Sequence, residues 1–150
     1  MKKIGRYDII EELGRGATGI VYRGFDPTIG RVVAVKVVSL TSPTEAGIPG
    51  AREIFMRETR AAGRLSHPGI VAIHDALEDP GTQTCCIVME FVQGRTLENI
   101  LTLGPPLETE RIMTIIRQVA EALDYAHRQN VIHRDLKPAT SCWQMTARRS

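Results

Sequence analysis

Short runs of apolar and β-branched residues, which are typical of β-strands, occur in the first forty positions. Three such runs cover residues 7–13, 20–25 and 31–38, and a turn at residues 26–30 precedes the third run. The third run is the richest in β-branched residues, which favour strands. We expect the three strands to pair in antiparallel order, because that is the simplest arrangement for successive strands.

A loop rich in Ser, Thr, Pro and Gly at residues 39–50 separates these strands from a helix predicted at residues 51–65. The helix has a charged stripe and an apolar stripe, and Glu58 lies on the apolar one, between Ile54 and Leu65. An ionised carboxylate that faces a protein core needs a cationic partner. Glu58 is therefore a candidate for an internal ion pair, and the alternative is that it lies at the edge of the stripe and reaches water.

The helical pattern breaks at the His-Pro-Gly sequence of residues 67–69. Two more strands are predicted at residues 70–77 and 85–91, followed by a short helix at residues 96–101. The long helix predicted at residues 108–129 has a wide apolar face, which implies deep burial. Its apolar positions are Ile112, Ile115, Ile116, Val119, Ala120, Leu123 and Ala126.

The composition is that of a globular protein, since 43% of the 150 residues are apolar and 24% are charged. The formal net charge of +2 is too small to indicate a nucleic-acid or membrane partner. The spacing of Cys85, Cys86 and Cys142 fits neither a disulfide framework nor a metal site, which favours a reducing, cytoplasmic location. We recognise no signal peptide and no apolar run long enough to span a bilayer.

Residues 14–21 fit the pattern G-x-G-x-x-G-x-V, with glycines at Gly14, Gly16 and Gly19. Glycines let a backbone approach phosphate oxygens closely and present N–H donors to them. Dinucleotide-binding folds use the same glycine spacing, but there the last glycine opens a helix, whereas here a second strand follows. A plain glycine-rich hairpin is the remaining alternative.

Lys36 lies near the end of the most apolar strand and shares a face with Ala34 and Val38. A solvated lysine on a strand is common, but a lysine on an apolar face behind a candidate phosphate loop is less so. Lys36 could pair with Glu58 and hold a phosphate group at the same time.

The strongest chemical signal is the sequence His-Arg-Asp-Leu-Lys-Pro at residues 133–138, which begins within a short strand predicted at residues 131–135. It places a carboxylate, Asp135, two residues before Lys137. A carboxylate that accepts a hydroxyl proton, with a lysine near the migrating phosphoryl group, is what phosphoryl transfer requires.

The glycine loop, the strand lysine, the helix glutamate and His-Arg-Asp follow one another in an order that resembles the protein kinase family. The likeness is greater to its bacterial serine/threonine members and covers the chain from about residue 5 to residue 139. It implies that Lys36 binds the α- and β-phosphates of ATP and pairs with Glu58, while Asp135 acts as catalytic base. Lys137 belongs to the same catalytic set and is typical of serine/threonine rather than tyrosine kinases. The ATP-binding residues that the resemblance implies are Leu13, Gly14, Arg15, Gly16, Ala17, Thr18, Gly19, Val21, Ala34, Lys36, Glu58, Met89, Glu90 and Val92.

For the adenine ring, the resemblance implies packing against Val21 and Ala34. Met89 would lie behind the adenine pocket. The backbones of Glu90 and Val92 would offer hydrogen bonds to the base.

The implied fold is α+β. A protein-kinase-like N-terminal lobe, with a five-stranded antiparallel sheet and one main helix, would occupy residues 1–92, and an incomplete helical C-terminal lobe would begin at residues 93–139. ATP and Mg²⁺ are the implied cofactors, and a protein substrate is the implied partner of the intact parent. We expect no nucleic-acid partner and no membrane segment in this chain, although the parent could carry a membrane anchor elsewhere.

Residues 140–150 depart from the family pattern. The family has a magnesium-binding Asn where this chain has Thr140, and the Asp-Phe-Gly sequence that supplies a second magnesium ligand is absent from the chain. We therefore expect this chain to lack metal ligands and to be catalytically impaired.

The genetic code suggests a cause for this departure. Read one base earlier, the codons from Ala139 onward are compatible with Asn-Ile-Leu-Leu-Ala-Asp-Asp-Gly, which resembles the continuation of the family and includes its Asn. Cys142-Trp143 must then read as Leu, whichever codons are used. Our hypothesis is a single-base deletion at or just after the codon for Ala139, and the alternative is a sequencing error in an intact gene.

Three functions remain open at this point. The first is ATP-dependent phosphorylation of protein Ser/Thr, as a property of the intact parent. The second is a non-catalytic nucleotide-binding or scaffolding module, and the third is a non-functional truncation product. The DNA sequence across codons 135–150 and beyond would discriminate among them.

Overall fold

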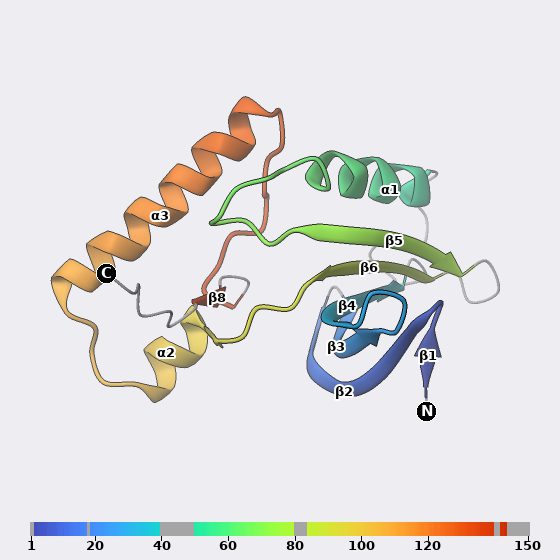
Figure 1. Cartoon of the computed structure of the whole chain (residues 1–150). Helices are drawn as coiled ribbons and strands as arrows, with labels where there is room; N and C mark the ends of the chain where they lie inside the picture. The colour runs from blue at the N-terminus through green and yellow to red at the C-terminus, as the bar shows by residue number, and fades with distance from the viewer. Residues whose placement is uncertain (1, 18, 40–49, 80–83, 140–141, 144–150) are drawn as a thin grey trace. The chain divides into compact units, whose positions relative to one another are not determined.

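The computed structural model describes residues 2–17, 19–39, 50–79, 84–139 and 142–143. Within them, an antiparallel sheet of six strands has the order β1-β2-β3-β4-β6-β5 (Figure 1). The predicted five strands are β2 to β6, and the two-residue β1 adds a sixth beside β2. The strands are β1 (Lys3–Ile4), β2 (Tyr7–Gly16), β3 (Gly19–Asp26), β4 (Arg31–Ser39), β5 (Ile73–Asp79) and β6 (Thr84–Glu90).

Strand β6 lies between β4 and the edge strand β5, so the chain crosses over after β4 to form β5 and then returns with β6 to pair with β4. The crossover contains helix α1 (Ala51–Ala62), which lies along β5 (Figure 1). Arg52 of α1 forms an ion pair with Glu78 of β5, which ties the start of the helix to this edge strand.

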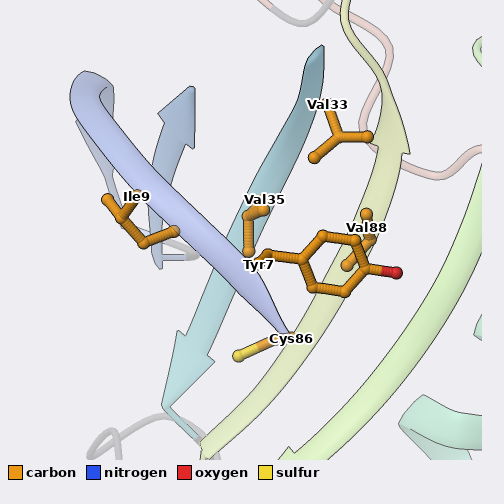
Figure 2. Packing of buried hydrophobic residues seen from close by; sticks show 6 residues of the cluster. All are labelled: Tyr7, Ile9, Val33, Val35, Cys86 and Val88. Carbon is orange, nitrogen blue, oxygen red and sulfur yellow. The ribbon is translucent and has the colours of Figure 1, made fainter. Parts of the chain in front are cut away.

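One face of the sheet carries its hydrophobic core (Figure 2). Alternate residues of β4 and β6 point to this face, because successive side chains of a strand lie on opposite sides. Val33, Val35 and Val88 have no exposed surface. The cluster consists of Tyr7, Ile9, Val33, Val35, Cys86 and Val88.

A charged network joins the start of β2 to the β3–β4 turn and to β5. The Tyr7 hydroxyl donates a hydrogen bond of 2.9 Å to Oδ2 of Asp75, and Arg6 Nη2 lies 3.3 Å from the same oxygen. Arg6 Nε is 3.5 Å from Oδ2 of the fully buried Asp26, whose Oδ1 accepts the Thr28 N–H at 2.9 Å. Burial, together with the hydrogen bond to Asp75, raises the pKa of Tyr7 to about 12.

Helix α1 ends three residues before the predicted position, because Gly63 caps it with backbone bonds to Thr59 and Ala61. Glu58 is exposed and its neighbour Thr59 is 6% exposed, which agrees with the alternative that Glu58 lies at the edge of the apolar stripe and reaches water. Arg52, Phe55 and Thr59 lie on one face of α1 at helical spacing, and Arg52 reaches β5.

The chain forms two compact units. The first contains residues 1–66 and 71–91, and the second contains residues 67–70 and 92–150. The second unit includes α2 (Leu97–Leu103) and α3 (Thr109–Arg128), close to the two helices expected from the sequence. It also includes the short strands β7 (Arg95–Thr96) and β8 (Cys142–Trp143), which pair with each other.

Local signals explain where these helices begin and end. The Thr96 side chain caps α2 by accepting the Asn99 N–H at 3.2 Å. After α3, Asn130 adopts a left-handed conformation with φ 59°, and the Val131 N–H donates to the Ala126 carbonyl at 2.9 Å. This six-to-one bond across a left-handed residue is the Schellman arrangement, which satisfies the last carbonyls of a helix.

The strand predicted at residues 131–135 is not present. The Schellman bond turns Val131 back onto the end of α3, and Arg134 has a left-handed φ of 62°, which no strand accommodates. Among the residues that the structure describes, no helix is long and apolar enough to cross a membrane.

Candidate active site

The glycine-rich loop is the turn of the β2–β3 hairpin. Gly14 lies opposite Val21, and Gly16 lies opposite Gly19, so the loop runs directly into a strand, as expected. A Cβ atom added at Gly14 or Gly16 would meet no heavy atom within 4 Å. The chain itself therefore leaves open the space next to these two glycines.

Gly19 serves a different purpose in the same loop. Its φ is 133°, and a Cβ atom there would lie 2.1 Å from the carbonyl oxygen of Val37. Only glycine allows β3 to approach β4 this closely. Of the other residues predicted in this loop, Leu13, Arg15 and Ala17 are exposed, and Thr18 lies outside the described residues.

The predicted nucleotide-binding side chains of the sheet share the face opposite the hydrophobic core. Val21 lies opposite Lys36, and Ala34 lies opposite Met89. Directly opposed residues of antiparallel strands have side chains on the same face, and so have residues two positions apart. Val21, Ala34, Lys36 and Met89 therefore line one surface, and Ala34 is buried while the other three are half-buried.

This surface explains why Lys36 is not an ordinary solvated lysine. Its neighbours on the same face of β4, Ala34 and Val38, are 8% and 7% exposed. The half-buried Lys36 side chain thus lies on a largely apolar surface, where a negative partner would stabilise its charge more than in water. Lys36 and Glu58 are each engaged in interactions, and the pairing of the two stays a prediction.

The end of β6 is held to the chain before β5 by two hydrogen bonds. The Glu90 N–H donates to the Ala72 carbonyl at 2.8 Å, and the Glu90 carboxylate accepts the Ala72 N–H at 3.3 Å. These two bonds hold Glu90 in place. Glu90 is one of the two residues whose backbone is predicted to contact adenine. Val92, two residues later, is half-buried and belongs to the second unit.

The predicted catalytic loop lies in the second unit. Lys137 Nζ is 3.3 Å from Oδ2 of Asp135, and both side chains are about half exposed, at 52% and 57%. The Asp135 N–H donates to Nδ1 of His133 at 3.2 Å, closing a tight turn around the left-handed Arg134. The loop thus presents a carboxylate to solvent with a cation beside it.

Two features of this site escaped the sequence analysis. The contact between Glu90 and Ala72 joins residues 18 positions apart, and no periodicity signals a bond from a side chain to a distant backbone. The His133 bond to Asp135 is local, so the His-x-Asp spacing could have indicated it.

Comparison with known proteins decides the family. The sequence profile described as "Protein kinase domain" matches residues 7–140. This chain belongs to the protein kinase family. A chain from Lactococcus lactis, named "Probable serine/threonine-protein kinase PknB", is 44% identical over 134 residues, which are 89% of this chain and 21% of that protein. Serine/threonine-protein kinase PrkC of Bacillus subtilis is 34% identical over 89% of this chain and 20% of its own length.

A solved structure agrees with these relatives. The crystal structure of the Mycobacterium tuberculosis PknI kinase domain matches with a TM-score of 0.76 and 35% identity, over 92% of this chain and 54% of that chain. This kinase chain therefore spans about half of the solved kinase domain and about a fifth of the curated relatives. The α+β kinase-like fold inferred from the sequence is confirmed.

Protein kinases in general use ATP and Mg²⁺. Among the described residues of this kinase chain, no three Asp, Glu, His or Cys side chains come together in a group that could hold a metal ion. Thr140, at the position of the expected Asn, lies outside the described residues.

Proposed function

We propose that the chain contributes the ATP-binding surface and the catalytic base of a kinase that phosphorylates Ser or Thr in proteins. One observation carries the proposal: Val21, Ala34, Lys36 and Met89 line one face of the sheet, next to a hairpin with open space at Gly14 and Gly16. An apolar surface with one cation, beside a hairpin that leaves open space, suits an aromatic base joined to phosphates. We also propose that residues 1–92 form the N-terminal lobe of the kinase domain and that residues 93–139 begin its C-terminal lobe.

The chemistry proposed for the parent enzyme is a single displacement at phosphorus. The substrate hydroxyl loses its proton to the Asp135 carboxylate while its oxygen bonds to the γ-phosphorus of ATP. The bond from that phosphorus to the βγ-bridging oxygen breaks, and ADP leaves. The positive charge of Lys137, 3.3 Å from Asp135, would stabilise the negative charge on the transferred group, and Lys36 would hold the α- and β-phosphates with Glu58 as its partner.

Binding of a nucleotide tests the first part of the proposal. A fluorescent ATP analogue should bind the 150-residue chain saturably, and Lys36→Met should weaken that binding about tenfold or more. Lys3→Met is the matched control, since Lys3 is an exposed lysine that pairs with Asp8 on β2. Equal binding by the chain and its Lys36→Met variant would favour a scaffolding role or a non-functional product.

Catalysis by this chain alone is a separate question. Thr140 replaces the expected Asn and no Asp-Phe-Gly is present, and the loss of one preorganised electrostatic group commonly costs about 10²- to 10³-fold in rate. We expect no measurable phosphate transfer from ATP with Mg²⁺ to a basic protein substrate. Activity that Asp135→Asn abolishes would show that residues 140–150 do not impair catalysis.

We further propose that residues 140–150 result from a single-base deletion near the codon for Ala139. The match to the kinase profile ends at residue 140, which supports a change at this point. The DNA should contain a second frame that continues with Asn-Ile-Leu-Leu-Ala-Asp-Asp-Gly and soon encodes Asp-Phe-Gly. Unrelated codons in that frame would rule out the deletion.

A further inference from the structure

Arg23 of β3 lies on the proposed nucleotide-binding face of the sheet, two residues beyond the end of the glycine-rich pattern. It is directly opposite Ala34 of β4, and directly opposed residues have side chains on the same face. It follows Val21 by two positions, so it lies farther from the glycine hairpin than Val21 does. Arg23 therefore extends the surface proposed for the base, away from the phosphate end.

A β-bulge in β2 brings a carboxylate opposite Arg23. The register of β2 against β3 shifts between Ile9 and Glu11, which leaves Ile10 as the extra residue. Because of this shift, Glu11 lies opposite Arg23, and its Oε1 accepts a hydrogen bond of 3.1 Å from Nη1 of Arg23. The pair is exposed, so it adds little to stability, but it orients the guanidinium.

The guanidinium of Arg23 also lies over an aromatic ring. Its central carbon is 5.3 Å from the centroid of the Phe91 ring, which is within the range of a cation–π contact. Nε of Arg23 is buried and has no hydrogen-bond partner among the described residues. A buried donor without a hydrogen bond lowers stability, so this arginine is better explained by what it holds in place than by what it adds to folding.

Phe91 lies where the segment proposed to bind the base leaves the sheet. The last pair of β4 and β6 joins Val33 to Glu90, so Phe91 is the first residue beyond this ladder. Glu90 is held by its two bonds to Ala72. The backbones of Glu90 and Val92, on either side of Phe91, are the ones proposed to bind adenine. A side-chain contact at Phe91 therefore holds the middle of this segment.

We propose that Arg23 is a positioning residue for adenine recognition. It acts through Phe91, by tying the segment from Glu90 to Val92 to strand β3. Through Glu11 the same contact extends to β2, the strand that leads into the glycine hairpin. A segment that is fixed before the ligand arrives loses less conformational freedom on binding, which raises affinity. The inference rests on the proposed function and adds to it a residue outside the kinase motifs.

Three ligands separate adenine recognition from phosphate binding. The dissociation constants of ATP, adenosine and inorganic tripolyphosphate for the full 150-residue chain are measured by competition with the fluorescent ATP analogue. Arg23→Ala should weaken ATP and adenosine about fivefold and leave tripolyphosphate within about twofold of its original value. Lys36→Met should give the opposite pattern, with weaker ATP and tripolyphosphate and unchanged adenosine. General damage to the fold would weaken all three ligands.

A second variant tests whether Arg23 acts through Phe91. Phe91→Leu should reproduce the effect of Arg23→Ala, because leucine keeps the apolar bulk but has no aromatic face. It also replaces Arg23→Ala as the test if urea denaturation shows that Arg23→Ala does not fold. The double variant should bind ATP within about twofold of either single variant, because both changes remove the same contact.

Arg128→Ala is the matched control. Arg128 is also an arginine paired with a carboxylate, since its Nη2 lies 2.6 Å from Oδ2 of Asp124, but both residues are on α3 in the second unit. Its replacement should change none of the three dissociation constants.

The contrary results differ in what they overturn. Unchanged ATP binding by Arg23→Ala, or equal weakening of ATP and tripolyphosphate, would refute the positioning role and leave the proposed function standing. An effect of Arg23→Ala that Phe91→Leu does not share would also refute it, because Arg23 would then act independently of Phe91. If the unmodified chain did not bind the ATP analogue, the proposed function would fail, and this inference would fail with it.

Discussion

The glycines of the loop have two different roles. Gly19 permits a close approach of two strands, whereas Gly14 and Gly16 leave open space. Gly19→Ala should lower the free energy of unfolding by about 2 kcal/mol or more, because φ 133° is strained for alanine and the new Cβ would overlap the Val37 carbonyl. Gly14→Ala should leave unfolding nearly unchanged, since nothing lies within 4 Å of its Cβ. Urea denaturation of both variants measures the difference.

The same two variants test nucleotide binding. If the backbone at Gly14 approaches a phosphate, Gly14→Ala should weaken binding of the fluorescent ATP analogue even though the fold is intact. Undiminished binding by a stably folded Gly14→Ala would mean that the open space at this position is not used by the ligand.

The stability of the first unit should depend on pH through the ionisation of Asp26. Burial raises the pKa of Asp26, but the Thr28 N–H and the positive charge of Arg6 outweigh it and hold the pKa below its ordinary value. A carboxyl whose pKa is lower in the folded state stabilises the fold above its unfolded pKa, about 3.9 for Asp, and this stability is lost as the pH falls through the folded pKa.

Asp26→Asn should therefore unfold more easily than the unmodified chain at pH 7, and the difference should shrink below about pH 4. Glu11→Gln is the control, because Glu11 forms an exposed ion pair with Arg23 and such pairs contribute little. Chemical denaturation followed at pH 7 and at pH 3 is the measurement. If the free energies of unfolding of the variant and the unmodified chain differed equally at both pH values, the pH dependence could not be assigned to Asp26.

At the scale of elements, α2 depends on one side-chain cap. Thr96→Ala should destabilise the second unit by about 1 kcal/mol, because the Asn99 N–H loses its acceptor. Thr102→Ala, within the same helix, should be neutral or slightly stabilising, since the Thr102 hydroxyl only bonds back to the Glu98 carbonyl. Thermal unfolding monitored by circular dichroism compares the two, and an equal loss in both would refute the capping role.

At the scale of the whole molecule, the two units should differ in local stability. Amide hydrogen exchange should be slowest in β4 and β6, which contain the fully buried Val33, Val35 and Val88, and faster in α2 and α3, whose unit has few buried apolar residues among those described. Ile112 and Ile116 of α3 are 40% and 55% exposed, so hydrophobic dye should bind to the unmodified chain and bind less after Ile112→Glu/Ile116→Glu. A sharp single transition with uniform protection and no dye binding would show that α3 has cover in solution.

The sequence by itself determined the elements and the family. Runs of apolar and β-branched residues bounded by turn signals located β2 to β6, and helical periodicity located α1 and α3. Local chemistry also placed Lys36 correctly on the face of Ala34 and Val38. These predictions succeeded because residue patterns and turn signals are properties of neighbouring residues.

Only the tertiary structure decided the features that depend on distant partners. The rotation of α1, which buries Thr59 and exposes Glu58, depends on how the helix packs against β5, where Arg52 pairs with Glu78. The chain after α3 turns back instead of forming a strand, because Val131 bonds to Ala126. Periodicity identified the apolar face of α3, but how much of that face is covered depends on which surfaces pack against it, and residues far away in the chain supply those surfaces.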